Sequence, residues 1–195
     1  MEIQPQLIGI LNTSNKQRET FRVYEGITDS QIDQLISYTQ SDPLVSKFTS
    51  DRKRFLNRDM FTVWREKKRS IYTLADQNGT LAGIMWFGRK EISPSVVVHI
   101  PRKSADYGIT FAIRLYQNAR GKHLAGKFMR FVFQAFKQTA TYQTIPHNGI
   151  WVKTSVDNLP AVCAYRSLGF KEVSIPDEKE KIVMILEETT SLPIQ

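Results

Sequence analysis

The chain has 195 residues, of which 41% are hydrophobic and 24% charged, so it fits one globular domain with a sizeable core. Lys and Arg outnumber Asp and Glu by 27 to 19, and the net charge of +8 favours an anionic partner, such as a phosphate-rich cofactor, nucleic acid or acidic lipid. The single cysteine, Cys163, excludes an internal disulfide bond and a cysteine-based metal site.

We expect one domain over residues 1–195, with 1–20 and 188–195 peripheral. The N-terminus has an acidic second residue and only a short apolar patch, so it is a poor signal peptide. No apolar run approaches the ~20 residues that a membrane span needs, so we expect a cytoplasmic protein with no membrane partner. The three histidines, His99, His123 and His147, lie far apart and form no local metal-binding pattern.

The first half of the chain predicts a strand, two helices and a hairpin. Phe21–Ile27 is typical of a strand, and Ser30–Gln40 has apolar residues at helical spacing, with Asp29 or Ser30 as its cap. Arg52–Arg69 indicates a second, basic helix. The two apolar runs from 70 to 88 flank Asn78-Gly79, which predicts a β-hairpin.

The second half alternates strands with helices. Residues 93–106 fit either a short strand or a loop, and Tyr107–Tyr116 alternates as a strand does. A helix, a strand, a second helix and a final strand then follow at Lys122–Gln138, Gly149–Val156, Leu159–Leu168 and Lys181–Glu187. A helical crossover between two strands predicts an α/β fold, a mixed central sheet with a parallel strand pair, flanked by helices.

The turn before the helix at 122–138 is both basic and small. A helix N-terminus presents free N–H groups and the positive end of the helix dipole, and Gly121 and Ala125 would let a phosphate approach it closely. The turn is not a P-loop, because Tyr116 stands five residues before Gly121, and no Gly-x-Gly-x-x-Gly is present. A solvated basic turn without a ligand remains the alternative.

A second stretch, Thr154–Phe170, favours the phosphate-binding turn over the solvated turn. Its helix begins near Asp157 or Asn158 with Pro160 in the first turn, and it ends at Gly169. The two stretches together resemble the GNAT superfamily of acyl-CoA-dependent N-acyltransferases. The motif Arg/Gln-x-x-Gly-x-Gly/Ala corresponds to Arg120–Ala125, and Asn-x-x-Ala-x-x-x-Tyr-x-x-x-Gly-Phe corresponds to Asn158, Ala161, Tyr165, Gly169 and Phe170.

The resemblance implies a GNAT-like fold with a splayed parallel strand pair over most of the chain, and acetyl-CoA as cosubstrate. It implies that an acetyl group passes directly to a primary amine of a small molecule or peptide. Backbone groups of the first parallel strand would pair with the pantetheine arm, and the loop N–H groups would hold the pyrophosphate. The cofactor-binding residues would be Ile113, Leu115, Arg120, Gly121, Lys122, His123, Leu124, Ala125 and Asn158.

Tyr165 is the candidate general acid, because a phenol with a pKa of about 10 can protonate a thiolate whose acid has a pKa of about 8.5. The alternative is an aromatic ring packed on the sheet with its hydroxyl hydrogen-bonded nearby. Asn158 could bind pantetheine or cap its helix. His123 stands where the family usually has Gly, and it could either crowd the pyrophosphate or donate to it.

The remaining assignments stay open. Cys163 is disfavoured as a nucleophile, since buried cysteine is common and no histidine is tied to it by a recognisable signature. Glu25, Glu91 and Asp106 are candidate general bases or ordinary surface carboxylates. The basic segment 52–69 is a solvated face or borders an anionic acceptor.

An N-acetyltransferase is the leading hypothesis, and a non-catalytic GNAT-like domain that binds acyl-CoA or a partner is the alternative. A nucleic-acid-binding protein is disfavoured, because no recognition motif is present. A homodimer remains open.

Overall fold

A computed structural model describes residues 4–13, 18–49, 52–93, 107–145 and 148–188. Within the chain two compact units form, one from residues 1–88 and 112–138 and the other from residues 89–111 and 139–195. The expectation of a single domain stays a prediction. The predicted segment at 93–106 lies outside the described residues except for Ser93.

The first unit contains an antiparallel sheet. Its strands follow one another in the order β1, β2, β3 and β4, and β5 comes next. Their bounds are Gln6–Asn12 for β1, Thr20–Glu25 for β2, Ser70–Ala75 for β3, Leu81–Arg89 for β4 and Ile109–Leu115 for β5. The predicted hairpin is present as β3 and β4. Strand β1 lies in a region for which the sequence indicates no element.

The helices of the first unit begin at polar caps. Thr28, rather than Asp29 or Ser30, caps α1 (Asp29–Ser41), because its hydroxyl and the Gln31 side chain form a reciprocal capping box. Helix α2 (Pro43–Phe48), which Asp42 caps, was not predicted from the sequence. Helix α4 (Leu124–Lys137) lies within the predicted range.

The basic segment 52–69 is not one helix, so that prediction is wrong. It forms a 3-10 turn, η1 (Arg52–Phe55), and then α3 (Arg58–Arg65). Asn57 separates them, because its backbone is extended and its side chain accepts a hydrogen bond from the N–H of Met60, which starts a new helix.

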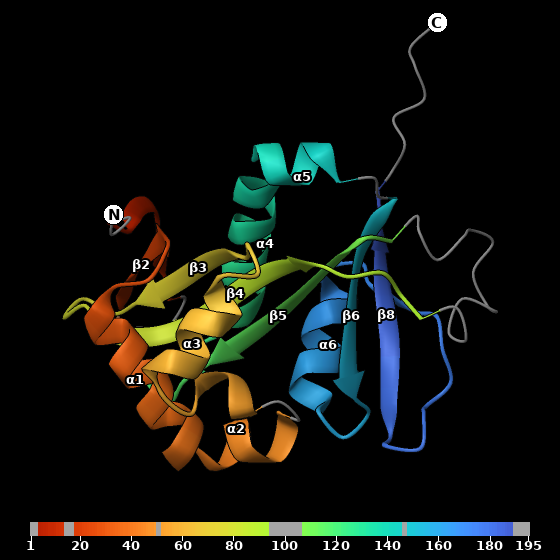
Figure 1. Ribbon diagram of the computed structural model, residues 1–195, viewed down its shortest axis with the longest axis horizontal. Helices are drawn as coiled ribbons and strands as arrows, with labels where there is room; N and C mark the ends of the chain where they lie inside the picture. Colours follow the sequence, from red (N-terminus) through yellow and green to blue (C-terminus); the bar gives the residue numbers. More distant parts are fainter. Residues whose placement is uncertain (1–3, 14–17, 50–51, 94–106, 146–147, 189–195) are drawn as a thin grey trace, which may run out of the picture. The chain divides into compact units, whose positions relative to one another are not determined.

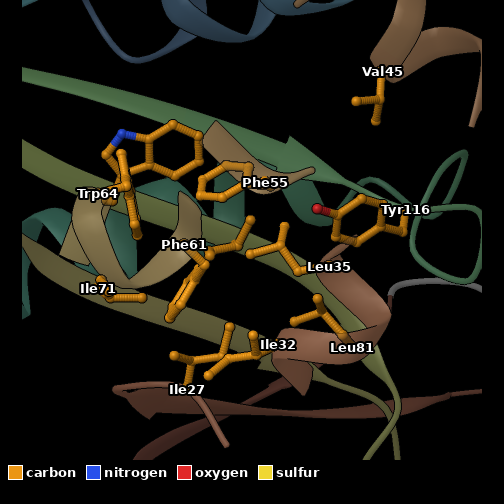
Figure 2. Packing of buried hydrophobic residues seen from close by; sticks show 12 residues of the cluster. Ile27, Ile32, Leu35, Val45, Phe55, Phe61, Trp64, Ile71, Leu81 and Tyr116 are labelled. Carbon is orange, nitrogen blue, oxygen red and sulfur yellow. The ribbon is translucent and has the colours of Figure 1, made fainter. Parts of the chain in front are cut away.

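Helices cover both faces of the strands in this unit, with α1 and α3 on one face and α4 on the other (Figure 1). Trp86 of β4 packs with Phe55 and Trp64 on the first face, whereas Phe87 stacks on Phe136 of α4 on the second. Figure 2 shows Phe55 beside Trp64. Because both faces are covered, β4 is buried from Leu81 to Gly88 rather than alternating.

The second unit contains the parallel pair. Strand β5 pairs with β6 (Gly149–Ser155) at Ile109–Ile150 and Thr110–Trp151, and these two pairs are parallel. Antiparallel pairing then joins β6 to β8 (Lys181–Glu187) and β8 to β7 (Lys171–Glu172). The mixed α/β fold with a parallel strand pair is therefore confirmed. Both strands of the parallel pair continue past the paired residues, β5 to Leu115 and β6 to Ser155.

Two helices belong to the second unit. The short helix α5 (Ala140–Thr144) was not expected, whereas α6 (Leu159–Ser167) lies where the sequence predicts it and runs beside β6 (Figure 1). Gly169 follows α6 with a positive φ of 93°, which a glycine adopts without steric cost at the end of a helix. Among the described residues, no helix is long and apolar enough to cross a membrane.

Candidate active site

The predicted phosphate loop follows the end of β5 in the first unit. The N–H of Tyr116 donates to the carbonyl oxygen of Ala82 at 2.9 Å, and the carbonyl oxygen of Tyr116 accepts from the N–H groups of Ala119 and Arg120. The chain then turns through residues 117–123 and enters α4 at Leu124. Hydrogen bonds to the sheet and within the turn thus fix where the helix begins.

Two residues of this loop have left-handed backbones. Gly121 has a φ of 73°, is exposed, and has no atom within 4 Å of the position that a Cβ would occupy. His123 has a φ of 55° at the N-cap of α4, and its side chain makes no capping hydrogen bond. Because a helix leaves its first N–H groups without intrahelical acceptors, this end of α4 offers donors to a ligand.

The backbone at His123 has a conformation that suits glycine better than histidine. A left-handed backbone costs a residue with a Cβ about 1 kcal/mol or more, whereas glycine adopts it freely. The departure from the family motif therefore strains the backbone at this point. The imidazole is exposed, so it does not contribute to the core.

Both basic side chains of the loop are paired with carboxylates. Arg120 makes a two-pronged contact with Asp42, at 2.8 Å from Nη2 to Oδ2 and 3.1 Å from Nη1 to Oδ1. Lys122 pairs with Glu19 and lies 5.5 Å from the centre of the Phe21 ring. The sequence gives no signal for Glu19 or Asp42, which lie about 100 and 80 residues before their partners.

The carboxylate of Asp42 is held in its charged form. Burial opposes the charge, but the hydrogen bonds from Arg120 and from the N–H groups of Val45 and Leu44 outweigh it and lower the pKa of this carboxyl. The side chain of Asp42 is 10% exposed and that of Arg120 is 30% exposed. This pair is therefore far better shielded from water than a surface ion pair.

The end of β5 departs from simple alternation. Ile113 and Leu115 are half-buried, whereas Arg114 between them is buried, so the predicted apolar face of Tyr107–Tyr116 does not continue through the strand. The guanidinium of Arg114 lies 4.8 Å from the Phe55 ring centre and 5.6 Å from that of Trp86, and Nη1 donates to Thr39. Cation–π contacts of this kind stabilise a buried guanidinium.

Tyr165 belongs to the second unit, on α6. Its side chain is 5% exposed, and its ring contacts Phe111 edge-on at 5.6 Å and Phe170 at 5.8 Å between centroids. Burial raises the pKa of the Tyr165 phenol, so the phenol stays protonated at neutral pH. Among the described residues, the structure gives the hydroxyl no hydrogen-bond partner. The alternative role for Tyr165 was a packed aromatic ring with a hydrogen-bonded hydroxyl. The ring is packed as that alternative requires, but the hydroxyl lacks the hydrogen bond among the described residues.

Two other residues of α6 were singled out from the sequence. Asn158 occupies the N-cap position, but its side chain makes no capping hydrogen bond, so the amide is not used to start the helix. Cys163 is exposed, so the argument from the common burial of cysteine does not apply to it. Its position on the outer side of α6 follows from Val162 and Tyr165 facing inward.

The candidate general bases remain undecided. Glu25 at the end of β2 and Glu91 after β4 are both exposed, and Asp106 lies outside the described residues. The described residues contain no group of three or more His, Cys, Asp or Glu that could hold a metal ion.

The sequence matches no protein-family model and no curated protein. Solved structures match the fold at low sequence identity. The GNAT domain of S. lividans PAT aligns with a TM-score of 0.59 at 12% identity, over 92% of this chain and 97% of that one. An aminoglycoside acetyltransferase, AAC(6')-Ib, in complex with coenzyme A and kanamycin aligns at 0.59 and 13%, over 86% and 95%. The Campylobacter jejuni N-acetyltransferase PseH in complex with acetyl coenzyme A aligns at 0.53 and 10%, over 87% and 99%.

Proposed function

Because the chain has the fold of the GNAT acetyltransferases, we propose that it is an N-acetyltransferase. It transfers an acetyl group from acetyl-CoA directly to a primary amine of a small molecule or peptide, with both substrates bound at once. Coenzyme A and acetyl coenzyme A are bound in two of the structures that share the fold.

The observation that carries the proposal is the loop at the start of α4. Its glycine is left-handed and has open space around it, and the helix that follows has no side-chain cap. Backbone N–H groups at such a helix end bind phosphate well, because they combine donors with the positive end of the helix dipole. The N–H groups of Gly121–Ala125 therefore hold the pyrophosphate of acetyl-CoA.

Tyr165 supplies the proton for the leaving group. The amine nitrogen attacks the thioester carbonyl carbon to form the C–N bond, the C–S bond breaks, and the thiolate sulfur takes a proton from the phenol. The proton that the nitrogen loses passes to water, and water in turn reprotonates the phenolate, so the products are the amide and the free thiol. The buried phenol remains protonated until this step, since burial raises its pKa. A hydroxyl with no partner among the described residues does not have to break a protein hydrogen bond before it donates.

The acceptor is an amine that a basic protein does not repel. A net charge of +8 disfavours strongly cationic acceptors, so we rank amino acids, peptides and singly charged amines above polyamines. Kanamycin is bound to one structure of the same fold, but that protein shares only 13% of its residues with this chain. Aminoglycosides therefore belong in the test panel without preference.

Two measurements test the proposal in order. Acetyl-CoA at a hundredfold excess over its Kd stabilises the folded protein by about 2.7 kcal/mol if it binds only the folded state, which a thermal shift detects. Thiol release from acetyl-CoA is then followed across amines, amino acids and peptides. No thermal shift and no calorimetric heat at millimolar acetyl-CoA would reject the proposal. Binding without turnover on any acceptor would support the non-catalytic alternative.

A further inference from the structure

We infer that Asp42 is a positioning residue for acetyl-CoA binding, because it holds the phosphate loop in shape through Arg120. This inference rests on the proposed function for its ligand, but the geometry of the Asp42–Arg120 pair stands on its own. Asp42 lies at the junction of α1 and α2, and nothing in its sequence context links it to the loop.

The two oxygens of Asp42 are fully used. Oδ2 accepts from Arg120 at 2.8 Å, while Oδ1 accepts from Arg120 at 3.1 Å and from the N–H groups of Leu44 and Val45 at 2.9 and 3.3 Å. One carboxylate thus starts a helix and holds the loop arginine at the same time. A two-pronged contact between guanidinium and carboxylate fixes orientation as well as distance.

A second contact joins the same corner to the beginning of the loop. The ring of Tyr116 lies 4.5 Å from the ring of Tyr38 on α1, and the N–H of Asp42 donates to the carbonyl oxygen of Tyr38 at 2.9 Å. Tyr116 in turn accepts the hydrogen bonds that close the turn at Ala119 and Arg120. The end of α1 therefore holds both the first residue of the loop and its arginine.

This arrangement indicates that Arg120 orients the loop and does not bind the phosphate itself. Two of its N–H donors point at a carboxylate whose side chain is 10% exposed, so pyrophosphate would have to compete with a shielded anion for them. Within the described part of the chain, the backbone N–H groups that follow, from Gly121 to Ala125, donate to no carboxylate. The guanidinium therefore sets the direction of the loop, and the backbone binds the phosphate.

The other loop cation provides a matched control. Lys122 and Glu19 are 26% and 34% exposed, their contact is single-pronged, and Glu19 caps no helix. Releasing Lys122 from Glu19 should leave the loop backbone in place. Glu19→Gln is therefore expected to change the Kd for coenzyme A by no more than about twofold, because a single contact between two half-exposed side chains contributes little.

Asp42→Asn is the test variant, because asparagine is as good a helix cap as aspartate and α2 is retained. We expect its Kd for coenzyme A, measured by calorimetry, to rise about tenfold, a change of about 1.4 kcal/mol in binding free energy. Without any ligand, hydrogen exchange at the amides of Gly121–Ala125 should become faster than in wild type. In Glu19→Gln it should not. A purely structural role for Asp42 would not change exchange in this loop alone.

A double variant tests whether Asp42 and Arg120 act on coenzyme A affinity through their contact with each other. Arg120→Gln alone leaves Asp42 without its cation and should weaken binding more than Asp42→Asn does, whereas Arg120→Gln with Asp42→Asn restores part of the affinity through an amide pair. An unchanged or tighter Kd in Asp42→Asn would overturn the inference, since Arg120 would then be a phosphate ligand that Asp42 restrains. If Asp42→Asn does not fold, unchanged loop exchange in Arg120→Gln, which breaks the same pair, would overturn it equally. Failure of wild type to bind coenzyme A would reject the proposed function, while the exchange experiment still decides on Asp42.

Discussion

The loop before α4 and the surroundings of Tyr165 are stabilised by different kinds of interaction. The loop before α4 is partly exposed and charged, and its cations are paired with Asp42 and Glu19. Tyr165 on α6 is buried among aromatic rings, and burial alone raises the pKa of its phenol. Electrostatic contacts shape the first region, and apolar packing shapes the second.

This difference separates binding from chemistry. A loop of backbone donors interacts equally with the ground state and the transition state. A substitution that distorts the loop should therefore raise the Kd or KM for acetyl-CoA. Removal of a phenol that acts only when the C–S bond breaks should lower kcat. Each of the following variants changes one region and leaves the other as it is.

Tyr165→Phe has the largest expected effect. The ring contacts with Phe111 and Phe170 survive, but the proton donor is lost, so kcat should fall about a hundredfold or more while the KM for acetyl-CoA moves little. Stability should change by no more than about 1 kcal/mol, because the structure gives the hydroxyl no partner among the described residues. Steady-state kinetics and urea unfolding measure the two quantities.

Cys163→Ala is the matched control on the same helix, since this side chain is exposed and outside the proposed chemistry. Its kcat should equal that of wild type. A Tyr165→Phe enzyme with near wild-type kcat would remove the tyrosine from the mechanism. An unchanged kcat with a large KM would instead make it a binding residue.

Gly121→Val should raise the Kd for acetyl-CoA about tenfold. The φ of 73° costs a residue with a Cβ about 1–2 kcal/mol, and a branched side chain would also stand where the phosphates approach. The open space around Gly121 means that no protein atom clashes with the new side chain, so the unit should still fold. Calorimetry with coenzyme A measures the effect.

Gly79→Val controls for strain alone. Gly79 has a φ of 82° and open space around it, but it lies in the β3–β4 turn rather than in the loop. It should lose a similar amount of stability and keep wild-type affinity. Equal losses of affinity in both variants would mean that the loop is not the phosphate site.

Alkaline pH should distinguish the buried phenol from the charged loop. The pKa of Tyr165 is higher in the folded protein than its unfolded value of about 10, so its contribution to stability is complete below pH 10 and is lost as the pH rises towards the folded pKa. Tyr165→Phe should therefore lose about 1 kcal/mol less stability than wild type between pH 8 and pH 11. Urea unfolding at the two pH values checks this, and equal losses would show that the phenol is not shielded from water.

His123→Gly has the smallest expected effect. Glycine removes the backbone strain at a φ of 55°, but it also adds freedom to the unfolded chain, so stability should rise by no more than about 1 kcal/mol. Affinity for acetyl-CoA should be equal or slightly tighter, as measured by calorimetry. A clear loss of affinity would show that the imidazole itself contacts the phosphates.

The sequence by itself determined most helices and strands, and it supplied the proposed site residues. Alternation predicted a strand over Tyr107–Tyr116, which contains β5, and the apolar face of 124–136 together with the small residues before it predicted a helix start after that strand. These features are local, because residues within one or two turns of each other decide them. Local polarity also predicted the start of α6 near Asp157 or Asn158, although the side chain of Asn158, the N-cap residue, does not cap the helix.

Only the tertiary structure decided how the charges of the loop are used. The sequence shows that Arg120 and Lys122 are basic, but their partners Asp42 and Glu19 come from distant segments and carry no motif. It likewise could not show that Asn57 divides the basic segment, that Arg114 is buried over Phe55, or that Cys163 is exposed. An ion pair or a buried cation depends on which distant segments pack together. The periodicity of residues along the chain does not predict that packing.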